Sequence, residues 1–460
     1  MREFINTGRI DPTKRLVVER TKDFNEIYEI FDGADASQQS ERCIQCGDPF
    51  CLNKCPLQNY IPQWLKSVAE RDLEFAFKLS NEPSPFPEVM GRVCPHDRLC
   101  EGDCTLNDGH GAITIGSIET FINEEGFKAG YKPEFPGVKS DKKVAVIGSG
   151  PAGLSAATYL LRSGIGVSMY EKASRAGGLL TYGIPNFKLD KKVVDRRVKL
   201  LEEAGLALHF NCEVGKDIDF GEVANTHDAI FVGIGATKAK RAGIAGENAP
   251  NVYMSMEYLT AIQKKIFGEE YDKKFDFKDL DVVVIGGGDT AMDCVRTAKR
   301  EGAKSVNCLY RRDAQNMPGS RKEYKNAMEE GVDFTFYVSP KEIITDETGR
   351  AIGVNLIKTR LGAKDSSGRQ RMEEIKGSEF KINADVIIMA LGFDPVVPPF
   401  FAENGIETNE WGGVLVDKNY QTSTPGIYAG GDCYRGADLV VTAAYDGREA
   451  ARSIIKSLRK

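Results

Sequence analysis

One sequence plan occurs twice in this chain of 460 residues, and it constrains the fold more than any other feature. An apolar run leads into a glycine-rich turn, a helical stretch and a second apolar run, first over residues 143–172 and again over residues 281–312. This strand–turn–helix–strand order is typical of units that bind dinucleotides. Two copies predict an α/β protein with two Rossmann-like domains.

The first glycine turn reads GSGPAG and follows the apolar run VAVI. In such a turn the first glycine permits the tight bend, the second lets a pyrophosphate approach, and the third lets the helix pack on the strand. The N–H groups at the helix start attract phosphates. The second apolar run ends at Glu171, which can accept hydrogen bonds from ribose hydroxyls. We therefore predict a dinucleotide site at Gly148, Gly150, Pro151, Ala152, Gly153 and Glu171.

The second turn, GGGDTA, is a variant of the first and comprises Gly286, Gly287, Gly288, Asp289, Thr290 and Ala291. Its second apolar run ends at Arg311 and Arg312, where a site for NAD would carry an acidic residue. Two guanidinium groups can bind a 2′-phosphate through charge-assisted hydrogen bonds. The two arginines could instead be a solvated surface pair, but their position favours NADPH as the second nucleotide.

Two dinucleotides in one chain favour a flavoprotein reductase, with FAD in the first unit and NADPH in the second. The C-terminal stretch TSTPGIYAGGDC reaches Gly431 and Asp432, and a helical pattern begins near Thr442. The aspartate could bind the ribityl chain, and the helix start would direct its positive dipole to the flavin. The FAD domain would then be split: we expect domains at residues 1–140, 141–250, 251–391 and 392–460, with the third binding NADPH and the second and fourth forming the FAD domain.

Seven of the eleven cysteines lie between residues 43 and 104. They read C-x2-C-x4-C-x3-C-P at Cys43, Cys46, Cys51 and Cys55, and C-P-x4-C-x3-C at Cys94, Cys100 and Cys104. The close spacing followed by Cys-Pro is similar to the bacterial ferredoxin pattern. Zinc and redox-active disulfides are alternatives, but zinc cannot carry electrons. Two 4Fe–4S clusters need eight ligands, so one ligand must be another residue or one iron must be open.

Disulfide reductases with this domain plan keep a C-x4-C pair soon after the acidic residue of the first unit. Residues 173–190 contain no cysteine, so electrons from a flavin would need another outlet. The remaining four cysteines are scattered singly and are expected to be small buried hydrophobic residues.

Composition and the N-terminal region limit the other functions. The net charge of −6 disfavours non-specific binding of nucleic acid. The start of the chain does not have the pattern of a signal peptide, and no apolar run reaches the roughly 18 residues of a membrane span, so we expect a cytoplasmic protein. Residues 1–140 are polar and broken by Pro and Gly; a helical stretch is expected at residues 61–80 and a linker at residues 132–143.

The chain resembles the small (β) subunit family of bacterial NADPH-dependent glutamate synthase over nearly its whole length. The segments that carry the resemblance are RCIQCGDPFCLNKCP, GRVCPHDRLCEGDCTLNDGHGAITIGSIE, GGLLTYGIPNFKL, VVVIGGGDTAMDCVRTA, YRRDAQNMPGSRKE and YAGGDCYRGADLVVTAA. GRVCPHDRLCEGDC and NMPGSR are highly specific to this group. The N-terminal half of dihydropyrimidine dehydrogenase and the large subunit of the NADH-dependent, electron-bifurcating ferredoxin:NADP oxidoreductase are similar modules.

The resemblance implies that the N-terminal domain is helical and binds two 4Fe–4S clusters. One cluster would be held by Cys43, Cys46, Cys51 and Cys104, and the other by Cys55, Cys94, Cys100 and Glu119. His96 and His110 could compete with Glu119 for the eighth position, but we interpret both as structural residues.

The resemblance also extends the two nucleotide sites. For FAD it implies contacts from Gly178, Leu179, Lys188, Val214, Gly235, Gly431, Asp432 and Thr442, and for NADPH from Ala390, Leu391 and Gly392. An arginine of the pyrimidine-degrading relative is replaced here by Pro318, and Arg321 is the candidate substitute. No side chain is expected to form a covalent intermediate, because the cofactors carry the chemistry.

The implied function is that of an electron-input subunit. NADPH would be oxidised at FAD, and electrons would pass through the clusters to an FMN-containing large (α) subunit that makes L-glutamate from L-glutamine and 2-oxoglutarate. The chain has no cysteine directly after Met1 and no room for a barrel of about 250 residues, so we expect no glutamate synthesis without that partner. Two alternatives stay open: a transhydrogenase- or sulfide dehydrogenase-like NADPH:ferredoxin oxidoreductase with another partner, and a zinc-bound scaffold with degenerate nucleotide sites.

Overall fold

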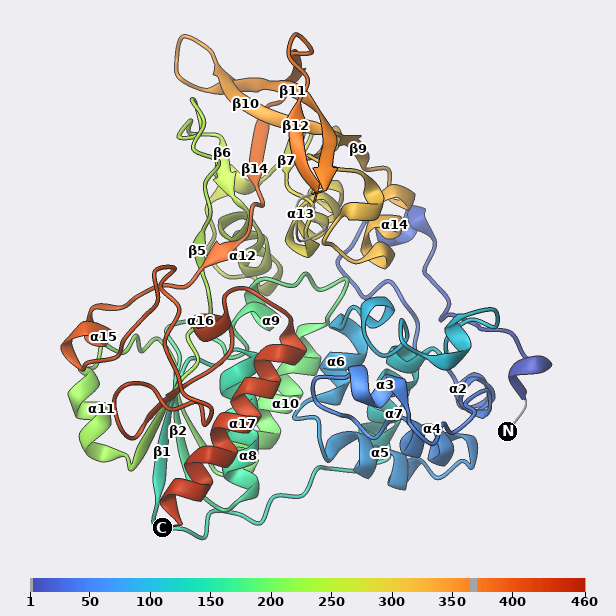
Figure 1. Ribbon diagram of the computed structural model, residues 1–460, viewed down its shortest axis with the longest axis vertical. Coiled ribbons are helices and arrows are strands. Elements are labelled where there is room, and N and C mark those ends of the chain that lie inside the picture. The colour runs from blue at the N-terminus through green and yellow to red at the C-terminus, as the bar shows by residue number, and fades with distance from the viewer. Residues whose placement is uncertain (1–2, 365–369, 460) are drawn as a thin grey trace.

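The computed structural model describes residues 3–364 and 370–459, and its chain forms three regions (Figure 1). Residues 3–131 are built from short helices joined by loops. Their only β contact among the described residues is an isolated bridge between Lys14 and Tyr28. The helices are α1 (Val17–Arg20), α2 (Gly33–Glu41), α3 (Phe50–Lys54), α4 (Ile61–Ala69), α5 (Leu73–Asn81), α6 (Pro87–Val93) and α7 (Ile115–Lys128), with 3-10 turns η1 (Glu3–Ile5), η2 (His96–Arg98) and η3 (Thr105–Asn107).

The stretch 61–80 is helical as predicted, but it is two helices. The break falls between α4 and α5, where Arg71 has a φ of +62° and the Asp72 carboxylate accepts a hydrogen bond from Phe75 N at 3.0 Å. Trp64 and Phe77 pack in the core of the region, whereas Phe75, which shares the apolar spacing, is half-exposed. The residues 132–142 that follow α7 contain no helix or strand, in agreement with a linker.

The first nucleotide unit contains a five-stranded parallel sheet in the order β16-β4-β1-β2-β3. These strands are β1 (Lys143–Ile147), β2 (Gly166–Tyr170), β3 (Leu206–His209), β4 (Ala229–Val232) and β16 (Ile427–Ala429). Its helices are α8 (Pro151–Arg162), α9 (Leu179–Tyr182), α10 (Lys191–Glu203), α11 (Phe220–Thr226), α15 (Pro399–Glu403), α16 (Asp432–Arg435) and α17 (Val440–Leu458).

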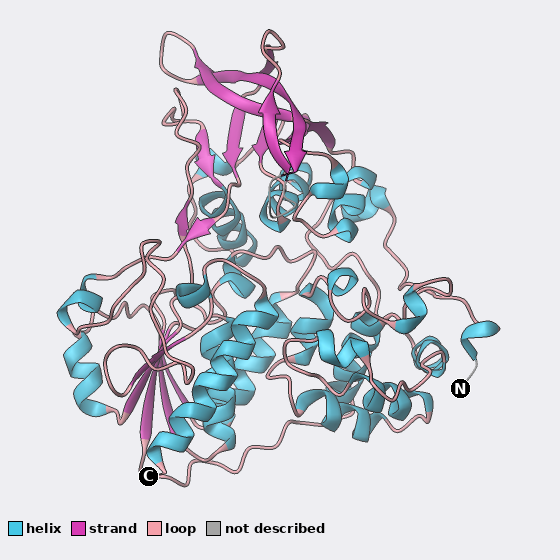
Figure 2. Cartoon of the chain, viewed as in Figure 1, coloured by secondary structure: helices cyan, strands magenta, loops and turns pink. Residues whose placement is uncertain are grey.

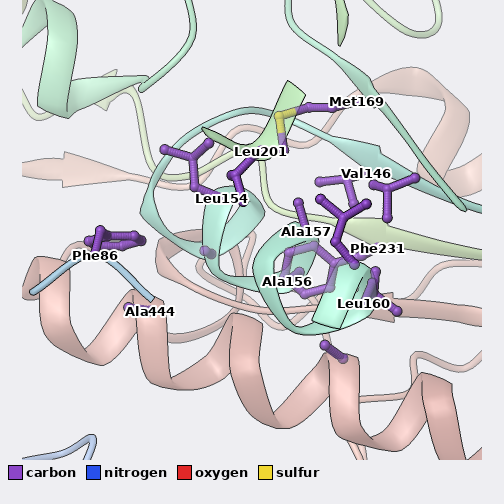
Figure 3. Packing of buried hydrophobic residues seen from close by; sticks show 14 of the residues in the cluster. Phe86, Val146, Leu154, Ala156, Ala157, Leu160, Met169, Leu201, Phe231 and Ala444 are labelled. Atoms are coloured by element: carbon purple, nitrogen blue, oxygen red, sulfur yellow. The ribbon is translucent and has the colours of Figure 1, made fainter. Parts of the chain in front are cut away.

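Helix α17 lies along α8 on this sheet, and the two helices share one apolar core (Figures 1 and 3). Ala156 and Ala444 belong to that core, and small residues let the helices approach closely. A Cβ atom on Gly447 would lie 2.1 Å from the carbonyl oxygen of Ala152, so glycine is required at this crossing. The C-terminal helix is therefore part of the first unit, as the split domain predicted.

The second nucleotide unit contains another five-stranded parallel sheet, in the order β6-β14-β7-β8-β9. Residues 282–285 of β7 are all buried, as expected for a strand covered on both faces. The strands are β6 (Val252–Met254), β7 (Asp281–Ile285), β8 (Ser305–Tyr310), β9 (Asp333–Phe336) and β14 (Val386–Met389); the helices are α12 (Ser255–Phe267), α13 (Asp289–Arg300) and α14 (Arg321–Glu329), with 3-10 turns η4 (Lys273–Phe275) and η5 (Ala314–Asn316).

An antiparallel sheet, which the sequence analysis did not predict, extends the second unit (Figure 2). It consists of β10 (Val338–Thr345), β11 (Ala351–Lys364), β12 (Gln370–Glu374) and β13 (Phe380–Asn383). The two chain connections between the nucleotide units pair as β5 (Lys238–Ala239) and β15 (Phe393–Asp394). The domain boundaries at residues 140, 250 and 391 stay predictions. Among the described residues, no helix has the length and apolar character needed to cross a membrane.

Candidate functional site

The first glycine turn has the geometry that its sequence predicted. Gly148 has a φ of +95°, and a Cβ atom there would lie 2.6 Å from the carbonyl oxygen of Gly233. A Cβ atom on Gly153 would lie 2.0 Å from the carbonyl oxygen of Gly148. At Gly150, by contrast, an added Cβ atom would meet no atom within 4 Å. The protein's own packing thus requires the outer glycines, while the middle one borders open space beside the start of α8, which fits a bound pyrophosphate.

The second turn repeats this arrangement. A Cβ atom on Gly286 would lie 2.3 Å from the carbonyl oxygen of Ala390, and one on Gly288 would meet nothing within 4 Å. Gly287 packs against the ring of Tyr310: a Cβ atom on Gly287 would lie 2.3 Å from Cδ2 of that ring. Ala291 is buried at the position equivalent to Gly153. Both turns therefore leave the middle position clear at the start of a helix.

Glu171 lies directly after β2 and is fastened to the first turn. Its Oε2 accepts hydrogen bonds from Ser149 N at 3.0 Å and Ser149 Oγ at 2.5 Å, and its Oε1 accepts one from Ala173 N at 2.8 Å. The structure places this carboxylate beside the glycine turn, where it was expected. The sequence analysis missed Ser149, although its position between two glycines of the motif marked it.

Several other predicted flavin residues gather around the same turn. A Cβ atom on Gly178 would lie 2.9 Å from Gly150 Cα, and one on Gly431 would lie 2.8 Å from Ala152 Cβ. Asp432 starts α16, and burial raises the pKa of its carboxyl group to about 7. Thr442 lies in the first turn of α17, where its Oγ donates to Leu439 O at 2.7 Å.

The remaining flavin candidates lie on several different segments. Leu179 begins α9, and Gly235 has a φ of +73° with open space around its Cα. Val214 is buried in an apolar cluster with Ile147. Lys188 reaches across to the second unit, where its Nζ donates to Asp293 Oδ1 at 2.8 Å; neighbouring carboxylates raise the pKa of Lys188 against the opposing effect of burial.

The arginines at the end of β8 are both present beside the second unit. Arg311 is exposed, and Arg312 Nη2 donates to Gln370 O at 3.3 Å. Within residues 3–364 and 370–459, the buried Nε of Arg312 has no hydrogen-bond partner. Arg321 is an exposed residue at the start of α14. Ala390, Leu391 and Gly392 directly follow β14, and Ala390 lies against Gly286.

A loop over the second turn was not anticipated. Gly319 N donates to Gly287 O at 3.0 Å, and Ser320 N donates to Asp289 Oδ1 at 2.8 Å. Arg98, from the N-terminal region, donates from Nη1 to Pro318 O at 2.5 Å. The NMPGSR segment thus covers the glycine turn, and the cysteine-rich region contacts it.

Four of the seven clustered cysteines are the predicted ligands of one cluster, and we call them the first ligand set: Cys43, Cys46, Cys51 and Cys104. Cys43, Cys51 and Cys104 pack against the same apolar core. Burial, together with the charges of Cys43, Cys104 and Cys46, raises the pKa of Cys51 to about 12. The pKa of Cys43 is about 11, with the same main cause. Cys46 Sγ lies 3.3 Å from Thr105 Oγ1.

The other predicted ligands, which we call the second ligand set, are Cys55, Cys94, Cys100 and Glu119, and all four line one cavity. Burial raises the pKa of Cys94 and Cys100 well above the usual value of a thiol, and the charges of Cys55 and Glu119 raise both further. The division of these eight residues between two clusters stays a prediction.

Glu119 is 5% exposed, although a helix glutamate considered alone is expected at the surface. Asn59 Nδ2 donates to its Oε1 at 2.6 Å, and burial raises the pKa of Glu119 to about 8. Three polar atoms that line or adjoin the cavity are buried without a partner in the described chain: Asn59 Oδ1, Ser84 Oγ and His96 Nε2. A buried carboxylate without an ion pair, next to such atoms, fits a cationic group in this cavity.

The described residues contain no group of three His, Cys, Asp or Glu side chains that converges on one metal ion. Tetrahedral zinc needs four ligand atoms within about 2.3 Å of one point. Each iron of a 4Fe–4S cluster takes one protein ligand, so cluster ligands lie farther apart. All eleven cysteines are free, and none lies in residues 173–190, so the disulfide outlet is missing as predicted.

Comparisons with known proteins identify the families of the two parts of the chain. Residues 20–131 match the family of dihydropyrimidine dehydrogenase domain II with a 4Fe–4S cluster, and residues 142–447 match the pyridine nucleotide-disulphide oxidoreductase family. The FprA structure of Mycobacterium tuberculosis in complex with NADPH has a TM-score of 0.60 at 19% identity, over 70% of this chain and 85% of that chain, which shows the shared fold.

Two relatives match nearly the whole chain. The oxidoreductase AegA of Escherichia coli is 46% identical over 97% of this chain and 69% of its own length. The glutamate synthase [NADPH] small chain of Halomonas elongata is 48% identical over 99% of this chain and 98% of its own length. The predicted fold class and cofactor types are confirmed: this chain belongs to the glutamate synthase [NADPH] small-chain family, whose members are NADPH-dependent oxidoreductases with FAD-binding and 4Fe–4S domains.

Proposed function

We propose that this chain takes electrons from NADPH and passes them, through FAD and two 4Fe–4S clusters, to a large FMN-containing subunit that makes L-glutamate. FAD supplies the change from two-electron to one-electron chemistry, and the clusters supply one-electron carriers. The residues of the chain bind and orient these groups.

One observation carries the proposal: the cavity lined by the second ligand set adjoins the flavin unit. Val441, in the first turn of α17, lines the cavity of the second set and is adjacent to the candidate flavin residue Thr442. Cys55 and Cys94 pack against the core of the flavin unit, whereas Cys43 and Cys104 pack only in the N-terminal core. The order flavin, second set, first set therefore leads electrons away from the flavin.

The binding roles follow from the two turns. In the first unit, the N–H groups at the start of α8 would hold the pyrophosphate of FAD, and Glu171 would hold its ribose. In the second unit, α13 and the loop at residues 318–320 would hold the pyrophosphate of NADPH. Arg311 would bind the 2′-phosphate, because it is an exposed guanidinium at the end of β8.

The partner would dock over the first ligand set. Phe50, which precedes Cys51, is 53% exposed and offers an apolar side chain to a partner beside the first ligand set. Covering this side chain would place the partner's redox centre next to the outer cluster. The partner we propose is the large α subunit with FMN and an amidotransferase domain.

The first experiment is an anaerobic purification of the chain with counts of iron, sulfide and flavin. About eight irons and one FAD per chain are expected for two clusters. NADPH should reduce an artificial dye in the presence of this chain alone, and glutamate should form only after the large subunit is added. A colourless protein with zinc and no flavin would refute the proposal and favour the scaffold alternative.

The similarity to AegA over 97% of this chain supports a second candidate, an NADPH-dependent reductase with another electron-accepting partner. The two candidates share every cofactor site and differ in the docked subunit. Affinity purification from the native source distinguishes them: an FMN amidotransferase subunit supports the first candidate, and a small ferredoxin-reductase-like subunit supports the second.

A further inference from the structure

His96 is a partly buried residue beside the second ligand set, and the proposed function does not use it. It begins η2, two residues after Cys94, and lines the same cavity as Cys55, Cys100 and Glu119. Its Nε2 atom is buried and has no hydrogen-bond partner in the part of the chain that the structure describes. A buried donor without a partner destabilises a fold, so the occupant of the cavity is expected to accept its hydrogen bond.

The position of the imidazole ring is fixed by close packing on α7. A Cβ atom on Gly116 would lie 2.3 Å from Cε1, 2.4 Å from Nε2 and 2.6 Å from Nδ1 of His96, so the ring occupies the space that a larger residue would fill. Gly116 and Glu119 are three residues apart on this helix and share one side of it. The ring therefore lies next to the carboxylate that lines the cavity.

The backbone of His96 also organises the turn that carries two of the ligands. Its carbonyl oxygen accepts hydrogen bonds from the N–H groups of Leu99 at 3.1 Å, Glu101 at 2.9 Å and Gly102 at 3.0 Å. Cys94 precedes this turn and Cys100 lies within it. A fixed backbone and a fixed ring give the Nε2 atom a defined direction.

We propose that His96 Nε2–H donates a hydrogen bond to a sulfur atom of the cluster held by Cys55, Cys94, Cys100 and Glu119, and thereby raises the reduction potential of that cluster. The inference rests on the proposed function and adds a residue to it. Hydrogen bonds to cluster sulfurs are one of the features that set the potential, because the donor stabilises the added negative charge of the reduced form. A neutral imidazole supplies one N–H group, and the ring need not change its protonation state.

The test compares wild type with H96L, H96Q and H110L as anaerobically purified full chains. His110 is the matched control, because it is the other histidine of the N-terminal region and its ring packs edge-on against Phe4 at 4.9 Å. Iron content and an EPR-monitored redox titration are measured for each protein. All are expected to keep their iron; only H96L should shift one cluster to a clearly more negative potential, and H96Q, whose amide can donate, should lie close to wild type.

An unchanged potential in H96L with full iron would overturn the inference and leave the proposed function intact. Loss of one cluster in H96L but not in E119A would make His96 a ligand and also overturn it. If both variants lose the cluster, pulsed EPR on the reduced wild type enriched in ¹⁵N-histidine distinguishes a hydrogen-bond donor from a ligand. A weak nitrogen coupling is expected. Either no coupling or the strong coupling of a ligand would contradict the inference. A wild-type chain with FAD but without iron would refute the proposed function itself.

Discussion

The two nucleotide units share the geometry of the glycine turn and differ in what closes around it. Around the first turn, Gly178 and Gly431 approach within van der Waals contact, and Gly447 of α17 packs on the helix that starts there. Around the second turn, the cover includes the loop at residues 318–320, which is held by hydrogen bonds to Gly287 and Asp289 and by one from Arg98. Packed glycine contacts suit a cofactor that stays bound, whereas a loop suits a nucleotide that binds and leaves.

The residue in the second position of the turn also differs between the two units. In the first unit Ser149 ties Glu171 to the turn, and in the second unit Gly287 leaves room for the ring of Tyr310. The same backbone geometry can therefore serve a resident or an exchangeable dinucleotide, and the neighbouring segments decide which. Substitutions at equivalent positions in the two units test this difference.

The largest effect is expected from Gly150→Ala. The added methyl group meets no protein atom within 4 Å, so the chain should fold, but the methyl group would occupy the space for the pyrophosphate of FAD. Flavin content should fall to near zero, and NADPH-dependent dye reduction should be lost. Full flavin content in this variant, measured by absorbance after anaerobic purification, would contradict the assignment of FAD to the first unit.

Gly288→Ala makes the equivalent change in the second unit. FAD and iron contents should equal those of wild type, while the KM for NADPH rises about 10–100-fold, because hydrogen bonds to a charged group contribute about 1.5–3 kcal/mol. Steady-state kinetics with a dye measures this effect. If Gly288→Ala loses flavin instead, the two units have been assigned in the wrong order.

A smaller and more selective effect is expected from Arg311→Gln. Removing the exposed guanidinium should raise the KM for NADPH about tenfold, since one charge-assisted hydrogen bond is lost, and should leave the KM for NADH unchanged. Arg321→Gln is the matched control on the neighbouring helix. An equal rise for both nucleotides in Arg311→Gln would show that this residue does not bind the 2′-phosphate.

The smallest effect is expected from Ser149→Gly. This substitution gives the first turn the residue type that the second turn has at the equivalent position, Gly287. The variant keeps the backbone N–H donor to Glu171 and loses the hydroxyl donor, so FAD should bind about fivefold more weakly, in line with about 1 kcal/mol for one hydrogen bond. Flavin release during dilution or dialysis measures the difference. Unchanged retention would mean that the hydroxyl does not help to hold the carboxylate in place for FAD.

Local patterns predicted the parts of the fold that depend on local geometry. Gly148 and Gly286 could be identified because a tight turn after a buried strand needs glycine, and Glu171 because it ends the next strand. Glu119 is different: its position on a helix predicts exposure, and only the resemblance to a family indicated a ligand. Its buried carboxylate accepts a hydrogen bond from Asn59, sixty positions away in the chain.

The parts that the sequence analysis missed depend on contacts between distant segments. Arg20 is buried beside Glu330 of the second unit, with Nε 3.1 Å from Oε1, and nothing in the residues around Arg20 marks it as buried. The antiparallel strands β10–β13 lie within a polar stretch of the sequence. Which of their side chains face inward is determined by the sheet of the second unit, against which these strands pack. Ion pairs and packing across such separations have no local signal.

The interrupted order of the flavin unit has a consequence for how the chain is made. β16 pairs with β4, and α17 packs on α8, yet both follow the whole of the second unit in the sequence. During synthesis, the segment 252–389 can assemble its own sheet as soon as it leaves the ribosome, while the flavin sheet waits for residues 427–458. The flavin can therefore be inserted only after translation. A chain made from a truncated messenger RNA that lacks its last codons would contain an assembled NADPH unit but would have no complete site for the flavin.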